Sequence, residues 1–401
     1  MKNSSRFTLG IVLFTILIDL IGFGIIIPVL PLYAEGGLFH ATPFQLGWLV
    51  GIFSLVQFIM APIIGKISDR VGRKPVLLLS VICTAVGFWI MGAATALWML
   101  FLARIIAGAS GGNISTAQAC IADITPADQR SKSMGLLGAA FGLGFVLGPA
   151  LGGMLSVHIS ASAPFYFAAV LAFCNAIFIA ICLPETLAKE NRIQASQKAP
   201  LSEVFAGGQG IFISAILGAY LASITGFSMM TTLFALFNEK RLGYGVNQTG
   251  YLLAYVGILG ILVQGGLLRR LVQKPIEKSH SAMGALLLVF GFLLLPFCGG
   301  AISLAAVLFL IALGNGFVVP TLNGLASRCS SSHMQGRVIG LMQSAGSLGR
   351  FGGPLIAMTL VKWDAPSHYG RTPFWGGAAF SLIACCLILT FSKEKIRLAE
   401  N

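Results

Sequence analysis

TLGIVLFTILIDLIGFGIIIPVLPLY, residues 8–33, is the first long apolar stretch of the chain, and Asp19 is its one charged residue. Apolar segments of about 20 residues are long enough to cross a bilayer as a helix. An ionised side chain near the bilayer centre costs about 2.5 to 3.5 kcal/mol on insertion scales, so such residues usually face a polar cavity or a partner. This stretch therefore predicts a membrane-spanning helix with a functional carboxylate.

The composition of the whole chain also indicates a membrane protein. Hydrophobic residues make up 56% of it and charged residues 10%, and the mean hydropathy is +0.88. Soluble domains contain roughly 25% charged residues. The first apolar stretch is too long for a signal peptide, so we expect it to be retained as the first span.

Windows of about 20 apolar residues predict twelve spans. An even number of spans puts both termini on the same side of the membrane. The windows are 8–34, 45–64, 76–95, 98–120, 133–157, 164–183, 209–237, 248–268, 280–298, 302–325, 336–360 and 374–391.

Basic residues gather on one side of these spans. Only Lys240, Arg241, Lys362 and Arg371 lie on the side opposite the N-terminus. The positive-inside rule therefore predicts that both termini are cytoplasmic, in a multi-pass protein of a cell membrane, with a bacterial inner membrane expected. The net charge of +13 is explained by short loops beside anionic lipid headgroups, so nucleic-acid binding is not expected.

The two halves of the chain resemble each other. GLLGAAFGLGFVLGPALGGML, which begins at residue 135, aligns with GLMQSAGSLGRFGGPLIAMTL, which begins at residue 340, and pairs Gly148 with Gly353. Internal repeats are typical of transporters, whose substrate sites lie near the midplane where the repeats meet. The predicted domains are an N-terminal six-helix bundle at 1–183, a cytoplasmic linker at 184–207 and a C-terminal six-helix bundle at 208–401.

The loop after the second span, GKISDRVGRKP at residues 65–75, is the most specific motif of the chain. A basic loop that only orients the chain accounts for Arg73 and Lys74, but not for Asp69 or the glycine spacing. The loop resembles the hallmark loop of the major facilitator superfamily, in which a carboxylate lies at the positive end of a helix dipole. The resemblance implies a latch that closes the cytoplasmic side against the eleventh span, made of Gly65, Asp69, Arg70, Gly72, Arg73 and Lys74.

Arg104 lies inside the fourth span, LFLARIIAGASGGNISTAQACIADITP. Helical spacing puts it close to one small and polar face with Gly108, Gly111, Ser115 and Gln118, which predicts a face that lines a wet cavity. Snorkelling toward the membrane surface is the alternative interpretation of the arginine. Arg104 resembles the embedded arginine of proton-coupled drug exporters, and this resemblance implies a role in proton transfer.

The fifth span repeats glycine at every fourth residue in GLGFVLGPALGG. Small residues at this spacing let two helices approach closely, and proline kinks a helix. The stretch also resembles the antiporter motif of drug:proton antiporters, which favours exchange over symport. The motif residues are Gly144, Gly148, Pro149 and Gly152.

The first span resembles that of the twelve-span, tetracycline-exporter-like branch, because Asp19 is followed by Pro28 and Pro31. The exporters of tetracycline carry further ionisable groups in the third, eighth and ninth spans. This chain lacks them at the aligned positions: Gly87 and Gly260 lie about where two of them would stand, and the ninth span is apolar from Ser281 to Cys298. A related but different substrate is therefore expected.

Several residues inside the spans are candidates for contact with the substrate. Amides in membrane helices also bond neighbouring helices, at about 0.6 kcal/mol each, and the sequence leaves both roles open. Two interpretations of Arg350 are open. It pairs with an anionic substrate or a carboxylate, or it simply lies near the cytoplasmic half of its bundle. The candidates are Gln57, Asn113, Ser115, Gln118, Phe227, Met230, Gln264, Asn315, Asn323, Gln343 and Arg350.

Together these features predict an all-α integral membrane protein with twelve transmembrane helices in two pseudo-symmetric six-helix bundles, the major facilitator fold. The expected function is export of a small amphipathic, drug-like compound in exchange for protons by alternating access, with Asp19 and Arg104 coupling the proton. A facilitator or proton symporter for a metabolite or siderophore is the alternative. No metal, cofactor or enzymatic constellation is apparent, and the expected partners of a monomer are substrate, protons and lipids.

Overall fold

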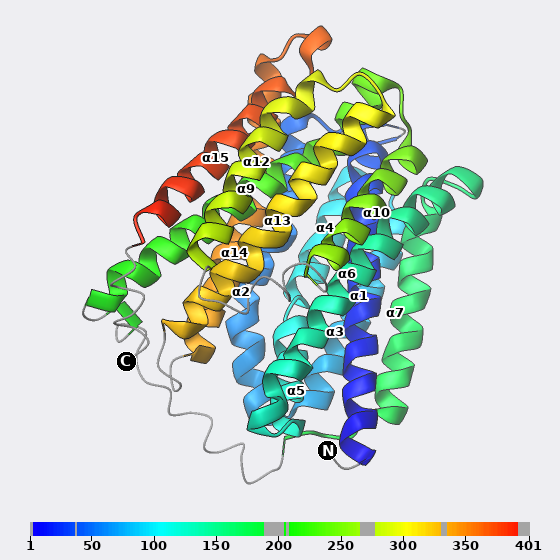
Figure 1. Ribbon diagram of the computed structural model, residues 1–401. Coiled ribbons are helices and arrows are strands. Elements are labelled where there is room, and N and C mark those ends of the chain that lie inside the picture. Colours follow the sequence, from blue (N-terminus) through cyan, green and yellow to red (C-terminus); the bar gives the residue numbers. More distant parts are fainter. Residues whose placement is uncertain are drawn as a thin grey trace. The chain divides into compact units, whose positions relative to one another are not determined.

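The chain folds almost entirely into α-helices in the computed structural model (Figure 1). The structure describes residues 3–36, 38–187, 204–205, 208–264, 277–329 and 335–391, and these ranges contain no β-strand. Each predicted span overlaps a helix, whereas most of the predicted linker at 184–207 lies outside the described residues. The helices are α1 (Asn3–Glu35), α2 (Pro43–Val71), α3 (Arg73–Gly92), α4 (Leu97–Ala109), α5 (Asn113–Ile124), α6 (Ala127–His158), α7 (Ala163–Cys182), α9 (Gly208–Leu242), α10 (Val246–Leu262), α12 (Glu277–Leu294), α13 (Ala301–Arg328), α14 (Gln335–Leu360) and α15 (Arg371–Leu389).

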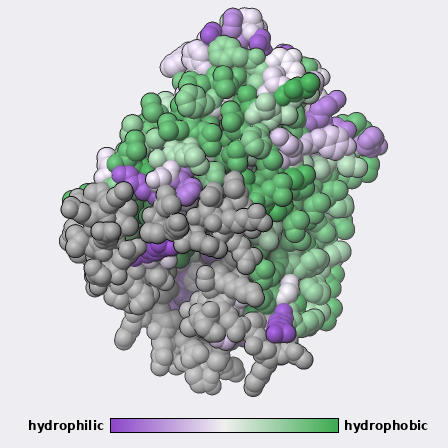
Figure 2. Space-filling model, in the orientation of Figure 1, coloured by the Kyte–Doolittle hydropathy of each residue, from purple (hydrophilic) through white to green (hydrophobic). Residues whose placement is uncertain are grey.

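The described helices suit a lipid environment. Ten of them, with α4 and α5 taken together, are long and apolar enough to cross a membrane. The shorter apolar helix α10 and the 26-residue helix α14 bring the described helical segments to the predicted twelve. Apolar side chains cover most of the described surface on the face shown in Figure 2, and large ones such as Phe173 and Ile181 are exposed. The prediction of an all-α integral membrane protein is confirmed.

Contacts group the chain into two compact units. The first lies within Met1–Lys198 and Tyr244–Ile258, and the second within Ala199–Gly243 and Leu259–Asn401. Most of α10 thus belongs to the first unit. The bundle boundaries predicted from the sequence remain predictions.

Helix α1 contacts four other helices of the first unit, α2, α5, α6 and α7. It packs along α6 and α7 and beside α5 (Figure 1). A helix that is apolar on all sides is favoured in the interior of a bundle, and Val12, Ile16 and Ile25 are fully buried. Asp19 lies on the same helix and is partly buried.

The fourth predicted span is not one helix but two, because residues 110–112 form a turn between α4 and α5. Glycine is a poor helix former, and here it also permits close contact with α2. A Cβ atom on Gly112 would lie 2.5 Å from Cγ2 of Ile64. Gln57 Nε2 donates a hydrogen bond to the Gly111 carbonyl at 2.9 Å. The sequence predicted a continuous helix because the approach of α2 is not visible in it.

Helix α9 has the place in the second unit that α1 has in the first. It packs along α14 and α15. A Cβ atom on Gly353 of α14 would lie 2.8 Å from the Thr225 carbonyl oxygen, and Gly349 also faces α9. Gly144 and Gly148, their partners in the repeat alignment, face α1 in the same way. The internal repeat is therefore present in the packing of each unit.

Candidate functional site

The carboxylate of Asp19 lies between α1 and the start of α5. Asn113 Nδ2 donates a hydrogen bond to Asp19 Oδ2 at 2.7 Å. The second oxygen, Asp19 Oδ1, is covered and accepts no hydrogen bond from a described residue. A buried polar atom without a partner costs about 1 to 3 kcal/mol, and more when it is charged. Asp19 is thus a carboxylate with one acceptor still open inside a membrane span.

Asn113 owes its position to the turn at residues 110–112. It is the first residue of α5, and it is only 6% exposed. The turn is also held from α3, where Thr84 Oγ1 lies 3.0 Å from Ser110 Oγ. The sequence placed Asn113 among the substrate candidates, but the structure brings its amide onto Asp19.

Arg104 is buried on α4 and binds α2 rather than Asp19. Its Nε donates to the Leu49 carbonyl at 3.1 Å, and its Nη2 donates to the Val50 carbonyl at 2.9 Å. The guanidinium carbon also lies 4.6 Å from the centre of the Phe53 ring. Neither Arg104 nor Asp19 forms an ion pair with a described residue. In this structure Arg104 fastens α4 to α2.

The continuous polar face predicted for the fourth span does not match the structure. The turn at residues 110–112 breaks the helical register between α4 and α5. Gly108 packs against α2, where a Cβ atom would lie 2.6 Å from the Phe53 carbonyl oxygen. Ser115 is exposed, and its hydroxyl donates to the Gly112 carbonyl at 2.9 Å. The α4 part of the face therefore contacts protein and does not line a wet cavity.

The glycines of the predicted antiporter motif face the helix that carries Asp19. A Cβ atom on Gly148 would lie 2.7 Å from both Gly24 Cα and the Ile21 carbonyl oxygen. Gly144, one turn earlier, lies against Leu20, the residue after Asp19. Glycine at these positions lets the backbones of α1 and α6 meet. Gly152 and Pro149 belong to the same stretch of α6.

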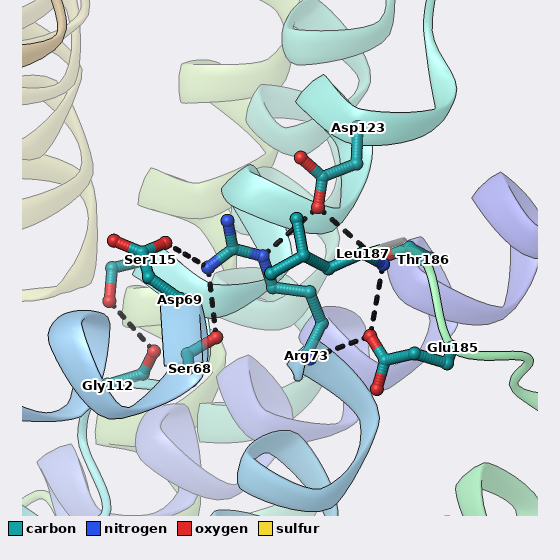
Figure 3. Close-up of polar contacts among 9 residues, drawn as sticks. All are labelled: Ser68, Asp69, Arg73, Gly112, Ser115, Asp123, Glu185, Thr186 and Leu187. Atoms are coloured by element: carbon teal, nitrogen blue, oxygen red, sulfur yellow. Dashed lines mark hydrogen bonds and ion pairs between the residues drawn. The ribbon is translucent and has the colours of Figure 1, made fainter. Parts of the chain in front are cut away.

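A charged cluster joins the loop after α2 to the end of α5 (Figure 3). Arg73 lies at its centre. Its Nη1 donates to Asp69 Oδ1 at 2.7 Å and to Ser68 Oγ at 3.0 Å, and its Nε donates to Asp123 Oδ2 at 3.0 Å. The planar guanidinium suits such multiple contacts with carboxylates. Asp69, predicted to face a helix N-terminus, pairs with Arg73 in this structure.

Glu185, which the sequence interpretation left inside a charged linker, caps the start of α3 (Figure 3). Its carboxylate accepts hydrogen bonds from the backbone N–H groups of Arg73 at 2.8 Å, Lys74 at 3.3 Å and Leu187 at 3.0 Å. The first N–H groups of a helix lack partners within it, and the helix dipole favours a negative charge there. The acidic residue directly after the sixth span was the available signal, but the sequence did not show that α3 starts beside it.

The remaining latch candidates have separate roles. Gly72 has a φ of 123°, which favours glycine, at the junction of α2 and α3. Lys74 Nζ donates to the Ala180 carbonyl at 2.8 Å, and Arg70 is exposed. A Cβ atom on Gly65 would meet no atom within 4 Å. The predicted contact of Gly65 with the eleventh span stays a prediction.

The substrate candidates fall into different environments. Gln57 holds the turn after α4, and Met230 is 1% exposed in the core of the second unit. Asn323 Nδ2 donates to the Val319 carbonyl of its own helix at 3.0 Å. The half-buried or exposed candidates are Gln118, Phe227, Gln264, Asn315 and Gln343.

Arg350 is half-buried on α14 in the second unit. Its Nη2 donates to Ser347 Oγ, one turn earlier, at 3.1 Å. A Cβ atom on Gly346 would lie 3.2 Å from Arg350 Nη1 and 3.1 Å from Cε1 of Tyr220, so the glycine makes room for both side chains. Arg350 has no ion pair with any carboxylate in the described part of the chain.

The described part of the chain has twelve helical segments, a repeated packing of glycine helices and polar groups inside the spans, which are typical of a multi-pass membrane transporter. The sequence profile of the Major Facilitator Superfamily matches residues 12–354, and the chain belongs to this family. The fold predicted from the motifs is thereby confirmed.

The similar proteins include drug-resistance proteins. The tetracycline resistance protein, class B, of Escherichia coli is 33% identical over 399 residues, which cover 98% of this chain and 96% of that protein. The quinolone resistance protein NorA of Staphylococcus aureus is 28% identical, with 97% of each chain covered. The crystal structure of the human organic anion transporter MFSD10 (TETRAN) matches with a TM-score of 0.73 and 25% identity, over 96% of this chain and 99% of that one. The predicted resemblance to a drug-efflux branch is confirmed.

Proposed function

We propose that the protein exports a small amphipathic, drug-like compound in exchange for protons by alternating access. The observation that carries the proposal is the Asp19 carboxylate, which has one open acceptor and lies on the helix against which the antiporter-motif glycines pack. The relatives named for tetracycline and quinolone resistance support a drug as the cargo. The third and eighth spans have no acidic, basic or histidine side chain, and the ninth span is apolar from Ser281 to Cys298, which favours a compound other than tetracycline.

Asp19 is the proton-coupling residue of this mechanism. A proton from outside forms an O–H bond with the carboxylate, which removes the cost of a buried charge and allows the return to the inward-open state. Contact with a wet vestibule on the cytoplasmic side favours the ionised form, and the proton leaves. Arg104 supports this cycle by holding α4 against α2 while α5 contacts Asp19.

The Arg73 cluster supports the proposed latch. It ties the α2–α3 junction to the ends of α5 and α7 through Asp123 and Glu185. These helix ends therefore move together when the cytoplasmic side opens or closes. The latch consists of the cluster with the glycines and basic residues of the loop at 65–75.

The distribution of basic residues supports the orientation. We place the protein in a bacterial inner membrane, as a monomer with both termini in the cytoplasm. The proposed bundles are residues 1–183 and 208–401, with a cytoplasmic linker at 184–207.

Arg350 supports an acidic group on the cargo. Its guanidinium has five N–H donors, and Ser347 accepts from only one of its nitrogens. A planar guanidinium suits a carboxylate, and the similar human protein is described as an organic anion transporter. An amphipathic acid is therefore the favoured substrate class.

Proteoliposomes with an imposed pH gradient test the proposal, with a panel of anionic, neutral and cationic drugs. Wild-type protein should give compound-triggered proton flux, strongest with amphipathic acids. Asp19→Asn should bind the compound but lose gradient-driven transport. Asp364→Asn, the same change outside the predicted spans, should transport normally. Full coupled transport by Asp19→Asn, or compound and protons moving in the same direction, would contradict proton exchange at Asp19.

A further inference from the structure

Two buried oxygen atoms at the Asp19–Asn113 contact accept no hydrogen bond. The amide nitrogen of Asn113 donates to Asp19 Oδ2 at 2.7 Å, so the carboxyl group and the amide group are in direct contact. The remaining oxygen of each group, Asp19 Oδ1 and Asn113 Oδ1, is covered and has no partner among the described residues. The two Oδ1 atoms are thus acceptors for which the contact supplies no hydrogen-bond donor.

A carboxylic acid and a primary amide have complementary edges. The amide N–H donates to one acid oxygen, and the acid O–H donates to the amide oxygen, so a planar ring with two hydrogen bonds forms. An ionised carboxylate makes only the first of these bonds, because it has no hydrogen to donate. One proton on Asp19 Oδ1 would therefore satisfy both open oxygens.

We infer that Asp19 and Asn113 form an acid–amide pair that holds the exchanged proton, on Asp19 Oδ1 and directed at Asn113 Oδ1. This inference rests on the proposed proton exchange and adds the second residue of its site. Uptake forms one O–H bond and cancels one negative charge, and release breaks that bond and restores the charge. Asn113 is a positioning residue, because it orients the acid and accepts its hydrogen bond without taking the proton.

The surroundings leave Asn113 as the partner of Asp19 in the described part of the first unit. Helices α2, α5, α6 and α7 pack against α1. The buried cation Arg104 donates to carbonyls of α2, and the amide of Asn175 on α7 accepts from Thr15, one turn from Asp19. The other described charged groups and histidines on these helices and on α1 lie at or near helix ends: Arg6, Glu35, Lys66, Asp69, Arg70, Asp123 and His158. The described tyrosines and cysteines on the same helices are Tyr33, Cys120, Tyr166, Cys174 and Cys182.

Infrared difference spectroscopy of the full-length protein in nanodiscs, over a series of pH values, tests the pair without measuring transport. Wild type should show a protonated-carboxyl C=O band on acidification that is absent in Asp19→Asn. In Asn113→Ala this band should move to higher frequency, because the C=O loses its donor and the O–H loses its acceptor. Asn175→Ala, which removes a buried amide one turn away, should leave the band in place.

Asn113→Asp, which keeps the size and shape of the side chain, tests the pair if Asn113→Ala does not fold. Asn113→Asp would put two carboxyl groups in contact, which cannot both ionise easily, so the titration of the Asp19 band should move to higher pH. A band that stays unchanged in both variants would overturn the pair. Loss of the band on replacing potassium with sodium at constant pH would also overturn it, since a metal cation would then occupy the two oxygens.

The two hypotheses fail separately. If the band behaves as expected but proteoliposomes show no compound-triggered proton flux, the acid–amide pair stands and proton-driven export is wrong. If the flux is present and depends on Asp19, but the carboxyl band is unchanged in the Asn113 variants, proton-driven export stands and the acid–amide pair is wrong.

Discussion

At the residue scale, Arg104 and Asn113 make contacts that their residue types did not reveal. The sequence indicated Arg104 because a charge inside a span is rare and expensive. Asn113 was one of many amides, and nothing in its type distinguished it. The turn at residues 110–112 directs Asn113 to Asp19, whereas Arg104 bonds two carbonyls of α2. Residue type could be judged from the sequence, but the direction of each side chain could not.

Arg104→Lys tests this assignment. A lysine ammonium keeps the charge but lacks the rigid fork that bonds two successive carbonyls, so it should lower stability by about 1 to 3 kcal/mol. Thermal unfolding of the purified protein in detergent measures the loss. Transport by the folded fraction should remain coupled to protons. Wild-type stability with uncoupled transport would instead assign Arg104 to the proton path.

At the scale of helices, the contact between α1 and α6 depends on backbone meeting backbone. Alanine favours a helix over glycine by about 1 kcal/mol, so glycine is retained at a cost. At Gly148 an added methyl would meet the α1 backbone at 2.7 Å, while at Gly138 on the same helix it would meet nothing within 4 Å. The sequence predicted a small-residue face, but not which helix it faces.

Gly148→Ala and Gly138→Ala form a matched pair on α6. Gly148→Ala should force α1 away, destabilise the protein and slow transport severalfold, because Asp19 lies on the displaced helix. Gly138→Ala should leave both properties close to wild type or raise stability slightly. Thermal unfolding and initial transport rates in proteoliposomes measure the two effects. Equal behaviour of the two variants would show that close packing of these helices is unimportant.

The start of α3 depends on a residue from far along the chain. Glu185→Ala removes the acceptor for the first N–H groups of α3 and should cost about 1 kcal/mol, as the loss of other helix caps does. Hydrogen exchange should rise at residues 73–76. Glu185→Gln, which keeps one acceptor oxygen, should show a smaller effect. Unchanged exchange at these amides in both variants would argue against the cap.

At the scale of the whole molecule, the repeat is preserved in packing but not in charge. Gly148 contacts Ile21 and Gly24 of α1, and its repeat partner Gly353 contacts Thr225 and Ser228 of α9. The same spacing along the two helices aligns Asp19 with Ser223. Ser223 is buried but cannot ionise near neutral pH. Of the thirteen acidic residues, Asp19 alone lies deep in a predicted span. The proposed proton exchange would thus use one copy of the repeat.

This asymmetry predicts one proton exchanged per compound. Reversal-potential measurements on proteoliposomes, with the pH and compound gradients opposed, give the ratio directly. A ratio of two or more would require a second proton carrier outside the acid–amide pair.

The architecture was predictable because twelve apolar windows and a repeated glycine pattern exist in the sequence itself. The break in the fourth span was not, because it depends on Ile64 and Gln57 of α2 approaching Gly111 and Gly112. The capping by Glu185 was missed for the same reason. Contacts between distant segments decide these details, and residue spacing along one helix does not contain them.

The interrupted fourth span has a mechanical consequence. Arg104 attaches α4 to α2, and Asn113 attaches α5 to α1, so the two parts of one span are fastened to different neighbours. If α1 shifts relative to α2 during transport, the turn at residues 110–112 is where this span would be expected to bend. A proton that strengthens the Asp19–Asn113 hydrogen bonding would hold α5 more firmly to α1, while Arg104 keeps α4 attached to α2.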